Sequence, residues 1–125
     1  MAKPVILIVD DAPNFRRFLR VSLDHVGVDC IEAANGLEAI EMAVPKVDLV
    51  ITDLNMEPMG GFELFRRIEL GVLGSPPPPV VFCSTSLDEP SVLERPEIAR
   101  AAGALSKPFL PKEVITLVRS ILEAR

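Results

Sequence analysis

Three aspartates follow two short apolar runs of the chain. Asp10 and Asp11 come directly after the run at 5–9, and Asp53 comes directly after the run at 47–52. An acid after a strand often caps the next helix, and a single aspartate is common in turns. Three carboxylates brought together repel one another unless a cation binds between them. Because their ligand atoms are all oxygen, the cation that suits such a group is Mg²⁺ or Mn²⁺ rather than Zn²⁺.

Two more polar residues stand at the ends of later apolar runs. Ser84 follows the run at 80–83, and Lys107 follows the short run at 104–106. Taken alone, the serine is an ordinary strand-end hydroxyl and the lysine an ordinary exposed side chain. Together with three carboxylates, they supply a nucleophile, a metal-binding group, a hydroxyl donor and a counter-charge. Phosphoryl transfer uses these parts, because its catalysis depends mainly on positioning and on neutralising charge.

Five strands and the helices between them would have to position these residues. The runs that predict strands are short, apolar and rich in β-branched residues, and they lie at 5–9, 28–32, 47–52, 80–83 and 104–106. Apolar residues recur at helical spacing after Pro13, after Asn35, after the glycine pair at 60–61 and after Pro111.

Some boundaries and one segment are less regular. We expect the first helix to extend to Gly27, and the second helix to include Val44. The proline-rich stretch 74–79 predicts a stiff surface loop. Between 88 and 103 the pattern is poor, and Pro96 should break any long helix there.

The regular alternation of strands and helices predicts a parallel sheet covered by helices on both faces. With right-handed crossovers, five strands favour the flavodoxin-like order 2-1-3-4-5, and we expect one stand-alone α/β domain over residues 1–125. In that fold the ligand crevice lies beyond the carboxyl ends of strands 1 and 3, where the strand order reverses. Asp10, Asp11 and Asp53 should therefore meet in this crevice, with the strand-end serine and lysine beside them.

The composition narrows the class of protein and its partners. The net charge of −5 argues against direct nucleic-acid binding, which favours basic surfaces. The apolar run before Asp10 is too short for a signal peptide or a membrane span, so we expect no membrane insertion and a cytoplasmic protein. The two cysteines, Cys30 and Cys83, both lie in strand-like runs, and we expect two buried thiols in a reducing compartment.

Four spaced motifs resemble those of the response-regulator receiver family of two-component signalling: Val9-Asp10-Asp11, Asp53-Leu54-Asn55-Met56, Ser84 and Lys107-Pro108-Phe109. The resemblance spans nearly the whole chain, and the four motifs together are far more specific than any one of them. It implies a domain that takes a phosphoryl group from a sensor histidine kinase or a histidine phosphotransfer protein. Its output would be changed contacts with a downstream protein.

The resemblance also implies a role for each acid. Asp53 would be the phospho-acceptor and would attack a phosphohistidine in line. Asp10 and Asp11 would bind Mg²⁺ together with Asp53, and the main-chain carbonyl of Asn55 would complete the protein's ligands.

By the same resemblance, Ser84 would bond a phosphoryl oxygen and Lys107 would pair with the phosphoryl group. The Lys107–Pro108 peptide bond would be cis. The domain would catalyse only its own phosphorylation and dephosphorylation, so it would not be an enzyme that acts on other molecules.

The chain departs from the family at two places. Glu57 stands where a proline is usual, which adds an acid near the expected metal, and the proline is displaced to Pro58. Ala104 stands where many members have an aromatic residue that rotates during signalling. We therefore expect a rebuilt output face, and we expect the segment 88–102 to contain the two-state element.

Other functions fit some of these residues. A receiver-like binding module would signal by protein contact without being phosphorylated. The altered loops fit this function, but the three acids and the lysine, all of which are present, argue against it. A phosphohydrolase with an aspartyl nucleophile would need an acid two residues after the nucleophile, where this chain has Asn55. A flavodoxin is less compatible, because the first loop offers carboxylates where a flavin phosphate needs amides and hydroxyls.

Overall fold

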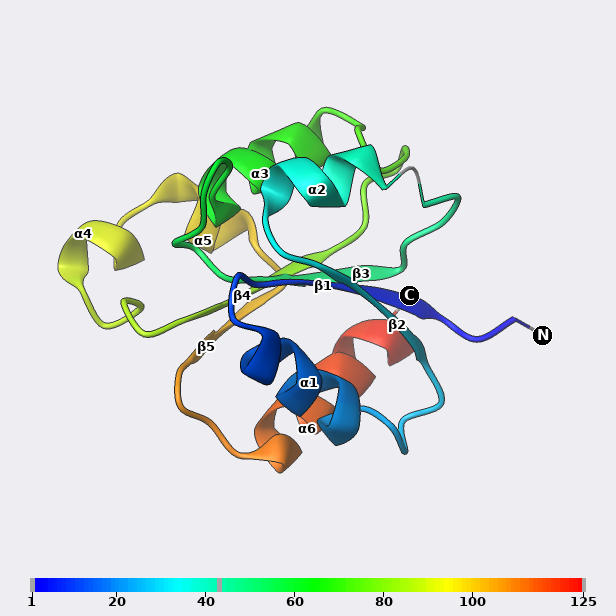
Figure 1. Ribbon diagram of the computed structural model, residues 1–125. Coiled ribbons are helices and arrows are strands. Elements are labelled where there is room, and N and C mark those ends of the chain that lie inside the picture. The colour runs from blue at the N-terminus through cyan, green and yellow to red at the C-terminus, as the bar shows by residue number, and fades with distance from the viewer. Residues whose placement is uncertain (1, 43, 125) are drawn as a thin grey trace.

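A five-stranded parallel sheet forms the centre of the molecule (Figure 1). The computed structural model describes residues 2–42 and 44–124. The strands are, in chain order, β1 (Val5–Val9), β2 (Asp29–Ala33), β3 (Leu49–Thr52), β4 (Val80–Ser84) and β5 (Gly103–Ser106). They lie in the order β2-β1-β3-β4-β5, which confirms the flavodoxin-like arrangement predicted from the sequence.

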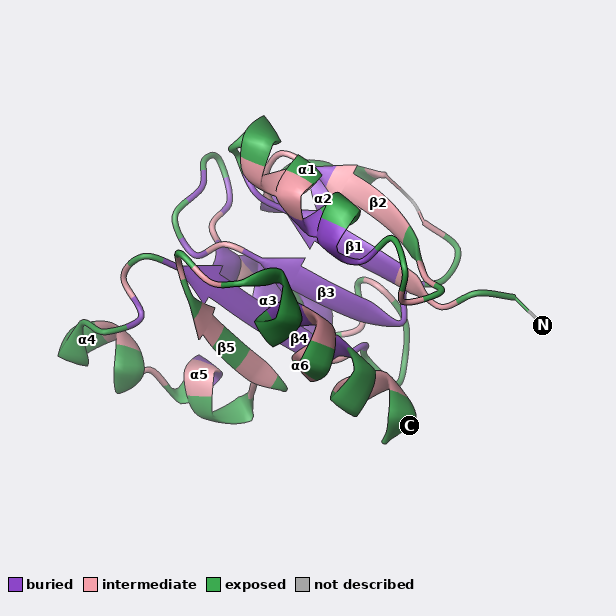
Figure 2. Cartoon of the chain, turned by 90° about the horizontal axis from the view of Figure 1, so that it is seen from below, coloured by how far each residue is buried: buried purple, intermediate pink, exposed green. Residues whose placement is uncertain are grey.

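The middle of the sheet is buried on both of its faces, as the purple strands in Figure 2 show. Continuous apolar runs form these strands because helices cover both faces of a parallel sheet and leave no polar side. β1 and β3 pair in a register that sets Val9 opposite Thr52. The next residues of the two strands, Asp10 and Asp53, therefore leave the sheet side by side.

Two layers of helices cover the sheet (Figure 1). α1 (Pro13–Ser22) and α6 (Pro111–Glu123) lie on one face, drawn below the sheet. On the other face lie α2 (Gly36–Glu41), α3 (Gly61–Glu69) and α5 (Pro96–Arg100), and α4 (Pro90–Leu93) extends outward at the left of the view.

The alternation of side chains along the strands divides the core into two clusters. Ile6 and Ile8 of β1 pack in the cluster beneath α1 and α6. Leu7 and Val9 of the same strand pack in the cluster beneath α2 and α3. Burial of these apolar side chains holds both helix layers against the sheet. The strand ends, from which the polar residues follow, are thereby fixed between the two layers.

Two helices are shorter than the sequence pattern predicts. α1 ends at Ser22, and the chain then makes tight turns to Gly27, whose φ of 81° lies in the left-handed region that favours glycine. α2 ends at Glu41, so Val44 lies beyond it. A residue before proline disfavours helical geometry, and Pro45 follows Val44 directly.

The irregular segment after β4 contains two short helices in place of one long helix. Pro90 begins α4 and Pro96 begins α5, each in a first turn where no backbone N–H is needed. This confirms that Pro96 interrupts the helical pattern.

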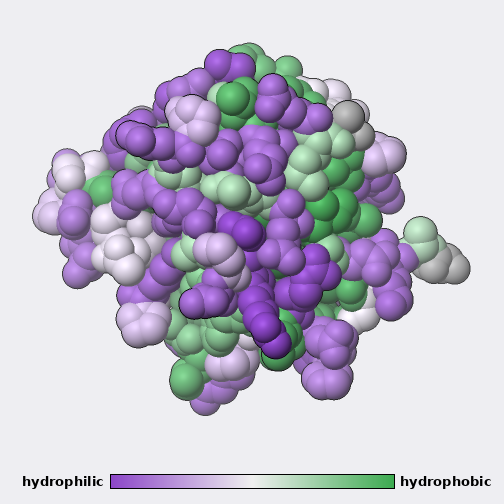
Figure 3. Space-filling view, viewed as in Figure 1, coloured by the Kyte–Doolittle hydropathy of each residue, from purple (hydrophilic) through white to green (hydrophobic). Residues whose placement is uncertain are grey.

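Hydrophilic side chains cover most of the face shown in Figure 3, with smaller hydrophobic groups between them. Within residues 2–42 and 44–124, no helix combines the length and the apolar character that crossing a bilayer requires. Cys83 is buried as predicted, whereas Cys30 is partly exposed because it lies on the edge strand β2.

Candidate functional site

Asp10, Asp11 and Asp53 come together at the carboxyl ends of β1 and β3. One carboxylate oxygen from each lies within 4.8 Å of the others. Asp10 is 1% exposed, Asp53 is partly buried, and Asp11 is exposed at the mouth of the site. The structure therefore confirms that the three acids lie close together, as the sequence predicts.

Backbone groups orient two of these carboxylates. The amide of Ala12 donates to Asp10 Oδ1 at 2.9 Å, and the amide of Leu54 donates to Asp53 Oδ1 at 2.7 Å. The start of α3 packs closely on the same turn. A Cβ at Gly61 would collide with the carbonyl oxygen of Asp53. A glycine is thus required at this position to close the loop that carries Asp53.

Lys107 reaches into the site from the end of β5. Its ammonium lies 2.7 Å from Asp10 Oδ2 and 3.6 Å from Asp53 Oδ2. The backbone amide of Lys107 donates to the carbonyl of Ser84 at 3.0 Å, which fixes the strand end next to β4. The Lys107–Pro108 peptide bond is cis, as predicted. This single ammonium faces carboxylates that carry more negative charge than it can neutralise.

The pKa of the Asp53 carboxyl reflects this charge balance. Burial raises it above its ordinary value, and the Lys107 ammonium and the Leu54 amide lower it only in part. The negative charges of Asp10 and Asp11 raise it further. An additional cation would therefore stabilise the charged form of Asp53.

Ser84 lies at the carboxyl end of β4 and is fully buried. Its hydroxyl lies 2.9 Å from the hydroxyl of Ser86 and accepts from the Ser86 amide at 3.2 Å. Ser84 thus stands where the sequence predicts, but its hydroxyl is bonded within its own loop. The sequence does not reveal Ser86 as a partner of Ser84, because only the folded turn brings the two hydroxyls together.

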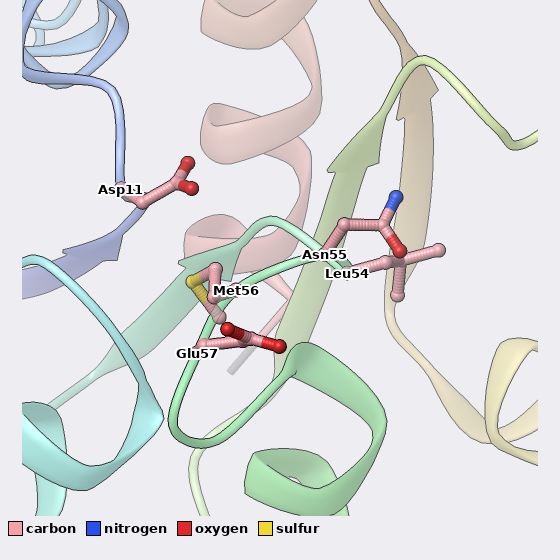
Figure 4. A pocket seen from close by; sticks show the side chains of 5 residues that line it. All are labelled: Asp11, Leu54, Asn55, Met56 and Glu57. Atoms are coloured by element: carbon pink, nitrogen blue, oxygen red, sulfur yellow. The ribbon is translucent and has the colours of Figure 1, made fainter.

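A hollow of about 510 Å³ opens between the loops that follow β1 and β3, and Asp11 is the one of the three acids that lines it. Figure 4 shows Asp11 on one side of it, reaching from the loop after β1, and the loop after β3 on the other. Asn55 and Glu57 of that second loop line the hollow and are exposed. The added acid predicted near the metal site, Glu57, therefore lies on the same hollow as Asp11.

The Phe15 ring is a second feature that the sequence did not reveal. The ammonium of Lys107 lies 4.0 Å from its centroid. Phe15 fits the apolar pattern of α1, so its spacing predicts only a core residue. No local signal connects it with a lysine near the far end of the chain.

Comparison with known proteins identifies the family. A family model described as the response regulator receiver domain matches residues 6–119. This chain belongs to the response-regulator receiver domain family. It is thus a receiver domain of two-component signalling, a class of signalling module.

Several curated proteins are similar to this receiver domain. The phosphate regulon transcriptional regulatory protein PhoB of Pseudomonas aeruginosa is 30% identical over 123 residues, which cover 98% of this chain and 53% of that protein. The transcriptional regulatory protein ResD of Bacillus subtilis is 32% identical over 118 residues, which cover 94% of this chain and 47% of ResD. The chain spans about half the length of these relatives.

Solved structures agree with the family assignment. The beryllofluoride-activated receiver domain of DrrB superposes with a TM-score of 0.84 at 25% identity, over 97% of this chain and 98% of that one. The chemotaxis response regulator CheY4 of Vibrio cholerae has a TM-score of 0.82 at 28% identity, over 96% of this chain and 99% of CheY4.

Proposed function

We propose that this receiver domain accepts a phosphoryl group on Asp53. The observation that carries the proposal is the cluster of three carboxylates within 4.8 Å, with the Lys107 ammonium 3.6 Å from Asp53. The Asp53 carboxylate would attack phosphorus in line. A bond from its oxygen to phosphorus would form as the bond from phosphorus to the donor's imidazole nitrogen breaks.

The donor set fits Mg²⁺, or Mn²⁺ in its place, because every side-chain ligand atom offered is a carboxylate oxygen. Asp10, Asp11 and Asp53 would hold the ion, with the main-chain carbonyl of Asn55 as a further ligand. When bound, the ion would neutralise and orient the transferring phosphoryl group.

Two other side chains would act on the phosphoryl group directly. Lys107 would neutralise part of its negative charge, since its ammonium already lies between Asp10 and Asp53. The Ser84 hydroxyl would leave Ser86 and donate to a phosphoryl oxygen, because a bond to a charged acceptor is stronger than one between hydroxyls.

The partners follow from this chemistry. The donor would be the phosphohistidine of a sensor histidine kinase or of a histidine phosphotransfer protein in the cytoplasm. The output would be changed contacts of residues 1–125, acting as one receiver domain, with a downstream protein.

Labelling with a small phosphodonor and Mg²⁺ tests the proposal. Wild-type protein should form one acyl phosphate, detected by mass and by its cleavage with hydroxylamine. Asp53→Asn should form none, whereas Asp24→Asn, at an exposed position, should be labelled like the wild type. Excess chelator should suppress the reaction.

Undiminished labelling of Asp53→Asn would move the acceptor to another residue. A wild-type protein that stays unlabelled with every donor would favour the binding module instead. Sustained hydrolysis of an external phosphate ester would favour the phosphohydrolase.

A further inference from the structure

The Lys107 ammonium rests on the face of the Phe15 ring. The distance from Nζ to the ring centroid is 4.0 Å, within the range of a cation–π contact. Phe15 lies in the first turn of α1, four residues after Asp11. The lysine side chain is only 15% exposed, so the contact is shielded from most of the solvent. The ring face carries partial negative charge and therefore attracts the ammonium.

The Phe15 ring is itself held by two others. Phe15, Phe18 and Phe109 form a triangle in which each pair of ring centroids lies 5.7 Å apart. Phe109 follows Lys107 by two residues. The triangle therefore joins α1, which begins beside the acids, to the segment that carries the lysine.

The contact with Phe15 differs in one respect from the contact with Asp10. In the proposed function Asp10 is a metal ligand, so a divalent ion competes with Lys107 for the same carboxylate. The ring has no oxygen to offer the metal and remains available to the ammonium. A lysine stem is flexible, so a contact independent of the metal is what would keep its charge beside Asp53.

We infer that Phe15 is a positioning residue: its ring holds the Lys107 ammonium beside Asp53 and thereby speeds phosphoryl transfer. The inference rests on the proposed function, because it assigns Lys107 to the phosphoryl group. A purely structural Phe15 would fill the core beneath α1, as Phe18 does, and any apolar side chain of similar size would serve.

Three variants separate these roles. Phe15→Leu keeps an apolar side chain and removes the ring, and Phe15→Tyr keeps the ring face. Phe18→Leu removes one ring of the same triangle but leaves the ring that faces the lysine.

The first measurement is made on metal-free protein. Protons above an aromatic face resonate upfield, so the ε-methylene protons of Lys107 should lie upfield of those of Lys3, Lys46 and Lys112. Phe15→Leu should remove this displacement, while Phe15→Tyr and Phe18→Leu should retain it.

The second measurement is the rate of labelling by the small phosphodonor with Mg²⁺. Phe15→Leu should be labelled about three- to tenfold more slowly, as loss of one shielded cation–π contact implies. Phe15→Tyr and Phe18→Leu should react at the wild-type rate. Thermal melts of the two leucine variants should be lowered alike, because each removes one ring from the same triangle.

The inference is overturned if Phe15→Leu leaves the Lys107 resonances unchanged, or if both leucine variants slow labelling equally. Failure of the proposed function would look different, because wild-type protein would then remain unlabelled. That result would remove the role of Phe15 in transfer, and the resonances would still report whether the ring holds the lysine.

Discussion

Glu97 and Asp53 are both carboxylates in contact with cationic side chains, but the charge around them has opposite sign. Glu97 of α5 is 7% exposed at its side chain and receives two guanidinium groups, with 2.7 Å to Arg66 Nη1 and 3.0 Å to Arg95 Nη2. Asp53 has one ammonium at 3.6 Å and shares it with Asp10, while Asp11 adds a further negative charge. The first carboxylate has an excess of cations, and the second has a deficit.

The difference separates a structural ion cluster from a binding site. Arg66 belongs to α3, so its pair with Glu97 fastens α5 to that helix, and Arg100 does the same with Glu69. Arg95 also lies over the ring of Phe62, with 4.1 Å to the centroid. Such a cluster is complete without a ligand. The carboxylates around Asp53 are under-neutralised by Lys107 alone, which fits the Mg²⁺ site that we propose there.

Neutralising each carboxylate should therefore change stability in opposite directions, and this is the largest effect expected. Glu97→Gln should lower the free energy of unfolding by about 1–2 kcal/mol, because it weakens charged hydrogen bonds whose arginines are half exposed. Asp53→Asn should raise the free energy of unfolding of metal-free protein, because it removes a charge that burial disfavours. Urea unfolding at pH 7 measures both, with Glu94→Gln as an exposed control on the neighbouring turn.

The pH dependence sharpens the contrast. The pKa of Glu97 is lowered to about 2, chiefly by its hydrogen bonds with Arg95. Its stabilisation is thus complete above the ordinary pKa of 4.5 and is lost as the pH falls toward about 2. The pKa of Asp53 is raised, so its unfavourable contribution is absent below 3.8 and grows as the pH rises through the raised value. Two variants that shift stability in the same direction at pH 7 would contradict the comparison.

Magnesium should give the next largest effect. At a concentration ten times its Kd, Mg²⁺ should raise the free energy of unfolding of the wild type by about 1.4 kcal/mol. Asp11→Ala should remove most of that gain and, without Mg²⁺, should stabilise the protein slightly, because one of the repelling charges is gone. Thermal melts with Mg²⁺ and with chelator provide the measurement. Clear destabilisation of metal-free Asp11→Ala would count against repulsion among these acids.

The acids were predictable from the sequence for a simple physical reason. β1 and β3 are continuous apolar runs, so their ends are unambiguous, and parallel pairing then sets the following residues side by side. The same logic places Ser84 and Lys107 at the ends of β4 and β5. The length and periodicity of the apolar pattern are enough to place these residues, because strands buried on their faces have few alternative pairing registers.

The partners of these residues were not predictable in the same way. Ser86 bonds Ser84 through a turn whose geometry no alternation of residues encodes. Phe15 meets Lys107 through the fold of the whole chain. The ends of α1 and α2 were also misplaced, because tight turns continue the apolar spacing beyond the last helical residue.

The two short helices of the segment 88–102, which we expect to switch, differ in how firmly ion pairs hold them. α5 is fastened to α3 by the ion pairs of Glu97 and Arg100. None of the four residues of α4 is buried, and Leu93 is 53% exposed. Local opening requires little free energy where few apolar contacts are lost, so α4 should move and α5 should stay in place.

The smallest expected effect is a change of amide exchange confined to α4. The Ser86 hydroxyl bonds the Ser84 hydroxyl. The Ser86 carbonyl accepts a hydrogen bond of 3.1 Å from the amide of Glu89, the N-cap residue of α4. When beryllofluoride binds Asp53, the Ser84 hydroxyl should turn to it and leave Ser86, which loosens this turn. Opening free energies at 89–94 should change by about 1 kcal/mol or less, the net value of a hydrogen bond, with smaller changes at 96–102.

Ser86→Ala provides the decisive variant, because it removes the hydroxyl that holds Ser84 in the free protein. Its exchange at 89–94 should resemble that of the beryllofluoride-bound wild type before any ligand is added. Thr85→Ala, one residue earlier and exposed, should exchange like the free wild type. If the largest change instead falls on α5, the ion pairs of Glu97 do not hold α5 in place, and if it falls on α6, the two-state element lies outside the segment 88–102. The contrast between a fixed half and a mobile half of this segment would then be wrong.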